Sequence, residues 1–190
     1  MEPTDQLAVI IPALIAVVDG IDDGQLDNPT PCAELDVRGV LDHMIGLASQ
    51  FVPAFLGEPA ADSLPAGGDV PTPSSQVPAS EFRTGMSSLL ESVNAPGAMD
   101  RMIDAPFGTV PGSVFARFVA FDGLVHGWDL ATSTGQSYDL PIDVVADVSA
   151  FAHEALVPDM RDGDTFAAEA TAPAGADAMT RLVAFSGRAV

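Results

Sequence analysis

The hydrophobic residues of this chain recur mostly at steps of three and four, the spacing that places side chains on one face of an α-helix. No segment alternates convincingly between apolar and polar residues, as a half-buried strand would. The sequence therefore favours an all-α protein, a bundle of four main helices with additional short helices in one domain over residues 1–190. The predicted helices cover about residues 5–18, 36–52, 80–94, 113–135, 142–157 and 178–185.

Several helix ends and breaks can be predicted from single residues. Asp36 follows a segment with two prolines and is a suitable N-cap for the second helix. Pro12 should kink the first helix or set its true start, because proline lacks the backbone N–H that a helix interior needs. Residues 57–78 are rich in Pro, Gly, Ser and Ala, which indicates a long loop.

The fourth helix carries two titratable residues inside an apolar stripe. Asp122 and His126 are four positions apart, so their side chains share one face of the helix. Phenylalanine and valine residues flank the pair on the same arc, and buried polar groups of this kind need a partner. The pattern leaves two alternatives equally open: a structural hydrogen bond between the two side chains, or joint binding of a metal ion.

The other histidines and the single cysteine carry weaker signals. His153 lies away from the apolar stripe of its helix and is predicted to be an exposed surface residue. His43 sits roughly 120° from the centre of its stripe, so periodicity favours a histidine at the rim over a ligand. Cys32 follows Pro31 in a turn and is predicted to be structural, and one cysteine allows no disulfide within the chain.

The composition limits the partners and the compartment. The chain is 47% apolar, and it has seven basic residues, all arginine, for a formal net charge of -20. This charge disfavours nucleic acid and anionic membranes as partners. No signal peptide is recognisable, so we expect a cytoplasmic protein. The fourth helix has a second apolar arc, which leaves both a monomer and a homodimer open.

Three segments resemble a known family: TPCAELDVRGVLDHMIG (Thr30 to Gly46), PFGTVPGSVFARFVAFDGLVHGWDLATSTGQ (Pro106 to Gln136) and RLVAFSGR (Arg181 to Arg188). They are similar to the mycothiol-dependent maleylpyruvate isomerase N-terminal domain family, part of the DinB-like group of metal-binding four-helix proteins. The chain departs from that family at Leu35, where tryptophan is usual, and it stops before the additional C-terminal domain of the isomerase.

The resemblance implies a metal site and a reaction class. It assigns His43, Asp122 and His126 as ligands of a divalent metal, with zinc as the first choice and nickel, manganese or iron as alternatives. Two histidines and one carboxylate leave open positions, as catalytic sites require.

The first functional hypothesis is a metal-dependent thiol transferase or isomerase that activates mycothiol or a similar small thiol toward a small electrophile. The alternatives are a metal-dependent hydrolase, in which Asp129 could orient His126 or a bound water, and a non-catalytic metal-binding or stress-response module.

Overall fold

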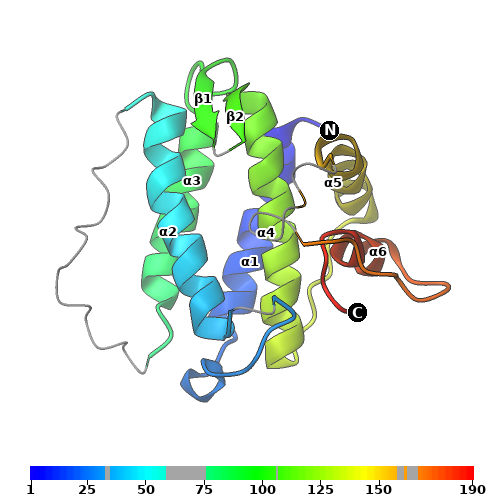
Figure 1. The fold of residues 1–190 in the computed structure, drawn as a ribbon. Helices are drawn as coiled ribbons and strands as arrows, with labels where there is room; N and C mark the ends of the chain where they lie inside the picture. The colour runs from blue at the N-terminus through cyan, green and yellow to red at the C-terminus, as the bar shows by residue number, and fades with distance from the viewer. Residues whose placement is uncertain (33–34, 59–75, 106, 158–160, 162–166) are drawn as a thin grey trace.

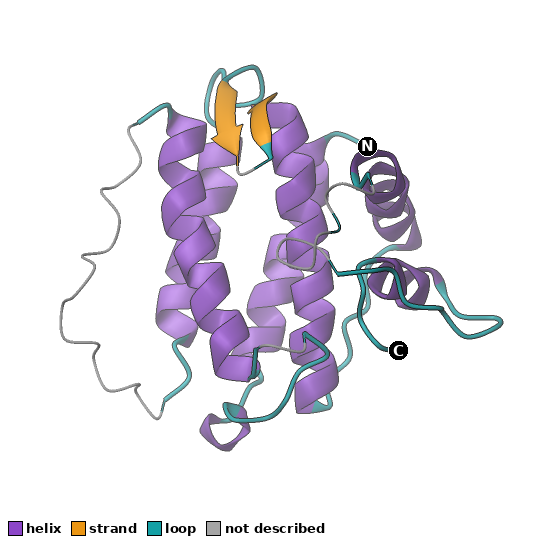
Figure 2. Cartoon of the chain, viewed as in Figure 1, coloured by secondary structure: helices purple, strands orange, loops and turns teal. Residues whose placement is uncertain are grey.

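The computed structural model describes residues 1–32, 35–58, 76–105, 107–157, 161 and 167–190. Most of the described chain is helical, as Figure 2 shows. The elements in chain order are α1 (Pro3–Asp19), the 3-10 helix η1 (Asp23–Gln25), α2 (Val37–Leu56), α3 (Ala79–Val93), β1 (Met102–Ala105), β2 (Gly108–Pro111), α4 (Gly112–Thr134), α5 (Ile142–Ala155) and α6 (Ala178–Phe185).

Helices α1 to α4 form the bundle, and the remaining elements lie around it (Figure 1). The most extensive helix contacts join α1 to α4 and α2 to α3. The short hairpin of β1 and β2 closes one end of the bundle, while α5 packs on α4 and α6 packs on α5. The predicted all-α fold class is confirmed, and the core is built from the apolar faces that the periodicity identified.

The hairpin corrects the expectation that the chain has no strand. Strands β1 and β2 pair antiparallel, with Ile103 opposite Val110 and Asp104 opposite Thr109. In the four residues of β1 only Ile103 is buried, so the strand is too short and too exposed to produce an alternating pattern. The hairpin leads directly into α4. The backbone N–H groups of Gly112 and Ser113 donate to the carbonyl oxygens of Arg101 and Met99, which precede the hairpin, at 2.7 and 2.8 Å.

Pro12 does not set the start of the first helix, because the helix begins at Pro3. Proline is tolerated at that position, since the first turn of a helix needs no backbone N–H. Pro12 lies inside α1 on its exposed side. Ala8, whose carbonyl would have accepted from the missing N–H, is exposed as well. Water can therefore solvate the unpaired carbonyl, which lowers the cost of a proline inside a helix.

Asp36 is the N-cap of α2, as predicted, and accepts a hydrogen bond from the backbone N–H of Gly39 at 2.7 Å. The segment before it is attached to the far end of α4. Asn28 donates through its side chain to the carbonyl oxygen of Ser133 at 2.9 Å, and its own carbonyl accepts from Val37 at 3.1 Å. These bonds hold the first turns of α2 beside the second half of α4.

Helix α2 is the one described helix that is long and apolar enough to cross a membrane by length and composition. A core helix of a soluble bundle meets the same criteria. Here α2 packs along α3 and contributes Val40, Leu41 and Met44 to the core. The loop predicted over residues 57–78 lies largely outside the described residues.

Candidate metal centre

Asp122 and His126 lie on the face of α4 that turns toward α2. His126 is buried, with 6% of its surface exposed, whereas Asp122 is partly exposed. Their closest atoms, Asp122 Oδ1 and His126 Nε2, are 3.5 Å apart. This separation exceeds the usual hydrogen-bond range of about 2.7–3.2 Å. It is close to the spacing of roughly 3.3 Å that two ligands of one tetrahedral zinc ion adopt.

His43 comes to this pair from α2. Its ring lies edge-on to the ring of His126, with 5.1 Å between the ring centroids and 68° between the planes. One ligand atom from each of His43, Asp122 and His126 lies within 4.8 Å of the other two. His43 is exposed and therefore opens the cluster to solvent. The three residues expected from the resemblance are thus brought together, although periodicity alone placed His43 only at the rim.

The surroundings of His43 lower the pKa of its imidazole. Desolvation is the main cause that lowers its pKa below the ordinary value, the charge of Asp122 acts in the opposite direction, and His126 and Arg188 lower the pKa further. Metal ions bind the neutral imidazole, so a lowered pKa reduces the competition from protons. Two imidazole nitrogens and a carboxylate oxygen at these distances fit a divalent cation such as zinc.

The other side of the His126 ring has a separate partner. His126 Nδ1 is 3.0 Å from Asp129 Oδ2, and Asp129 is fully buried. The structural hydrogen bond that the sequence suggested for His126 is therefore made with Asp129, three residues further along α4, and not with Asp122. The Nε2 atom on the opposite edge of the ring points to the cluster with Asp122.

A second possible ligand group, Cys32 with His126 and Asp129, also has ligand atoms within 4.8 Å of one another. A cation already lies at this group, because the Arg188 guanidinium donates to Asp129 at 2.9 Å through Nη2 and at 3.3 Å through Nε. Burial lowers the pKa of Arg188, but the hydrogen bond and charge of Asp129 outweigh it and raise the pKa overall. Asp129 is thus neutralised by arginine, and the cluster of His43, Asp122 and His126 is the better metal site.

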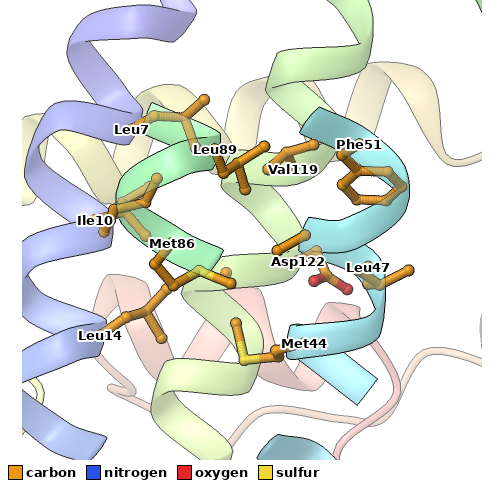
Figure 3. A pocket seen from close by; sticks show the side chains of 13 residues that line it. Leu7, Ile10, Leu14, Met44, Leu47, Phe51, Met86, Leu89, Val119 and Asp122 are labelled. Carbon is orange, nitrogen blue, oxygen red and sulfur yellow. The ribbon is translucent and has the colours of Figure 1, made fainter. Parts of the chain in front are cut away.

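An apolar cavity inside the bundle reaches Asp122, as Figure 3 shows. Residues of all four bundle helices line it, and among the described lining residues only Asp122 is ionisable. The lining is Leu7, Ile10, Ile11 and Leu14 from α1, Met44, Leu47, Ala48 and Phe51 from α2, Met86 and Leu89 from α3, and Val119, Asp122 and Gly123 from α4. The candidate ligands therefore lie between solvent at His43 and an apolar interior.

The remaining predictions about single residues have clear outcomes. His153 is exposed, as expected, and stacks on Phe185 with 3.8 Å between ring centroids. Cys32 is partly buried at the edge of the group around Asp129. Sequence reasoning missed Arg188, which is 59 positions from Asp129. No local spacing connects the two, and only the match of the RLVAFSGR ending to a family pattern marked that segment.

Known proteins are similar to the part of the chain that carries the candidate ligands. A family profile described as the mycothiol maleylpyruvate isomerase N-terminal domain matches residues 7–131. Two uncharacterized proteins of Mycobacterium tuberculosis, Rv0738 and MT0763, are each 33% identical to the chain over 180 residues, which is 94% of this chain and 93% of theirs. No solved structure matches significantly. The matched range includes all three candidate ligands and ends before Arg188.

Proposed function

The chain belongs to the mycothiol maleylpyruvate isomerase N-terminal domain family, and we propose that it is a divalent-metal enzyme that activates a small thiol, such as mycothiol, toward a small electrophile. The family supports a mycothiol-related, metal-dependent function in general terms. One observation carries the finer proposal: His43, Asp122 and His126 converge at a position that is open on the His43 side. Zinc is our first choice of metal because the donor set is two imidazoles and one carboxylate.

The chain supplies the surroundings that such a reaction needs. A zinc ion held there would lower the pKa of a thiol that takes its open coordination position. Asp122 would hold the cation at the mouth of the apolar cavity, and the exposed rim at His43 would admit the thiol from solvent. The apolar lining beside Asp122 would exclude water from the reacting sulfur. We propose transfer or isomerisation as the reaction class.

The hydrolase alternative has less support from the described residues. It needs a group beside the cluster that can accept a proton from water. The sequence suggested Asp129 only for orienting His126 or a bound water, and the contact with His126 is present. Asp129 is unsuited to accept the proton itself, because its carboxylate is fully buried and bonded to both His126 and Arg188. The non-catalytic alternative predicts a closed site that serves stability, whereas His43 is exposed.

Metal content is the first test of this proposal. Protein purified without a histidine tag should contain about one divalent ion per chain. The variants His43→Ala, Asp122→Asn and His126→Ala should lose most of it, because each removes one of three ligands. His153→Ala is the matched control, since it removes an exposed histidine outside the cluster. Elemental analysis measures the metal content, and circular dichroism shows whether each variant is folded. Equal metal content in wild type and all four variants would contradict the site.

Thiol dependence is the second arm of the test. The metal-loaded wild type should be stabilised against heat by mycothiol, and Asp122→Asn should show a much smaller shift. Turnover of maleylpyruvate or another small electrophile should depend on the thiol. If the metal is present and no thiol stabilises the protein, the thiol proposal is wrong, and hydrolysis of esters and amides is the next activity to assay.

A further inference from the structure

Behind His126 lies a buried ion pair that joins α4 to the end of the chain. Asp129 has no exposed surface, and the Arg188 side chain is 15% exposed. Arg188 Nη2 is 2.9 Å from Asp129 Oδ2, the same oxygen that lies 3.0 Å from His126 Nδ1. The three side chains thus form one continuous chain of contacts from arginine through carboxylate to imidazole.

The protons in this chain of contacts can be assigned from its chemistry. Arginine is always protonated and only donates, and an ionised carboxylate only accepts. Asp129 Oδ2 therefore accepts from the guanidinium and from His126 Nδ1, so Nδ1 must carry the proton in the neutral ring. The lone pair of the ring is then on Nε2, the nitrogen 3.5 Å from Asp122 Oδ1. The buried carboxylate selects the tautomer that presents a free lone pair to the cluster.

The turn after α6 brings Arg188 to this position. Gly187 has a φ of 98°, which other residues rarely adopt, and a Cβ there would meet the Ala167 side chain at 2.6 Å. The N–H of Arg188 donates to the carbonyl oxygen of Val183 at 3.0 Å. The backbone after the last helix is thus folded back on the helix, and the arginine is held where it can neutralise Asp129.

We propose that Asp129, held by Arg188, is the positioning residue of the metal centre: it fixes the orientation and tautomer of His126 so that Nε2 binds the metal. The inference deepens the proposed function and rests on its metal site. It also goes beyond the three ligands, because it makes the end of the chain, which lies outside the range matched by the family profile, part of the site. Partners of this kind typically change metal affinity by about 10- to 100-fold when they are removed.

Asp129→Asn is the variant that separates positioning from packing. The amide has nearly the same shape, but its NH2 group can donate to Nδ1 and so favours the other tautomer. Its zinc dissociation constant, measured by competition with a chromophoric chelator, should rise about 10- to 100-fold. Arg188→Lys should raise it less than Arg188→Gln, because lysine keeps the charge. The control is Arg117→Gln, which removes an ion pair between Arg117 on α4 and Asp147 on α5. This variant should leave the zinc dissociation constant unchanged.

Nitrogen-15 NMR of the histidine rings gives a second readout that needs no metal. In metal-free wild-type protein His126 should be protonated on Nδ1, and in Asp129→Asn the Nε2-protonated tautomer should increase. A role in packing alone would lower thermal stability without moving either the tautomer or the zinc affinity of folded protein. If the Asp129 variant does not fold, the tautomer and the zinc affinity are measured on Arg188→Lys, the mildest change.

The outcomes distinguish this inference from the proposed function. If wild type binds zinc and folded Asp129→Asn binds it equally with an unchanged tautomer, the positioning role is overturned while the metal site stands. If wild type binds no zinc but the tautomer shifts in Asp129→Asn, the proposed metal function fails and the role of Asp129 in setting the tautomer is supported.

Discussion

Asp177 shows how one residue of this chain ties local structure to the site. Its carboxylate accepts a hydrogen bond from the backbone N–H of Thr180 at 2.7 Å and so caps α6, the helix that leads to Arg188. The hydrogen bond from Thr180 is the main cause of a lowered pKa at Asp177, and the nearby charge of Arg181 lowers it further. Because a cap fixes where a helix begins, Asp177 also affects where Arg188 lies.

Replacing Asp177 with alanine should lower the free energy of unfolding by about 1 kcal/mol at pH 7, the usual cost of a lost N-cap. The pKa is lower in the folded state, so the charged form stabilises the fold above the ordinary pKa of aspartate, near 4. This stabilisation is lost as the pH falls from there through the folded value. Urea denaturation at pH 7 and at pH 3 should therefore show a smaller difference between wild type and variant at pH 3.

Asp177→Asn is the control for this effect. Asparagine can still accept the bond from Thr180 but carries no charge. The stability of Asp177→Asn should therefore be closer to that of wild type than the stability of Asp177→Ala is, at both pH values. An equal loss in Asp177→Ala and Asp177→Asn at pH 7 would show that the charge of the exposed carboxylate, and not the capping bond, carries the effect.

Among the elements, α4 is the helix most closely surrounded by other segments. It is buried on nearly every side, and two of its glycines allow neighbouring segments to approach closely. A Cβ at Gly123 would lie 3.2 Å from the Leu14 side chain of α1. A Cβ at Gly127 would lie 2.3 Å from the ring of Tyr138, which follows α4. Both glycines are next to the ligand pair in sequence, so the same turns of helix serve packing and the site.

Gly127→Ala should destabilise the protein by about 1–3 kcal/mol, because the aromatic ring has to move out of a packed position. Gly46→Ala in α2 is the matched control, since nothing lies within 4 Å of the added carbon. Alanine is the better helix former, so this control should be neutral or stabilising by up to about 1 kcal/mol. Thermal denaturation of both variants measures the contrast, and equal stability of the two would refute the packing argument.

For the whole molecule, the net charge of -20 is the dominant electrostatic property. The seven arginines can neutralise only a minority of the 27 acidic residues. Described ion pairs such as Arg83 with Asp19 therefore contribute attraction within a field of net repulsion. Compaction brings the carboxylates closer together, so folding works against this repulsion.

Added salt should therefore stabilise the protein. Raising sodium chloride from about 0.01 M to about 1 M shortens the screening length from about 30 Å to about 3 Å. We expect the melting temperature to rise by about 2–4 °C, which corresponds to roughly 1 kcal/mol for a chain of this size. Potassium chloride should act equally, since the effect is screening. A melting temperature that falls with salt would mean that attractive ion pairs outweigh the repulsion.

The fold was largely predictable because each helix buries a face whose period is visible in the sequence. The ends of the helices differ from the predicted ends by only a few residues, and caps such as Asp36 were identified correctly. The hairpin was missed because β1 has one buried residue, Ile103, and a single residue has no period. That Pro12 lies inside α1 and not at its start could not be predicted, because its tolerance depends on exposure of the opposite carbonyl, which a local pattern does not encode.

By itself, the sequence determined that Asp122 and His126 lie together on an apolar face, because residues four apart on a helix are neighbours whatever the surrounding fold. Asp129, three residues beyond His126, is a neighbour on the same helix for the same reason. Only the tertiary structure decided which distant side chains join these three residues. His43 and Arg188 are tens of residues away, and their contacts depend on how α2 and the end of the chain pack against α4. The resemblance suggested His43, and the packing of the helices brings it to the pair. Nothing in the spacing suggested Arg188, because proximity between distant segments comes from burial of shared surfaces, which no local pattern records.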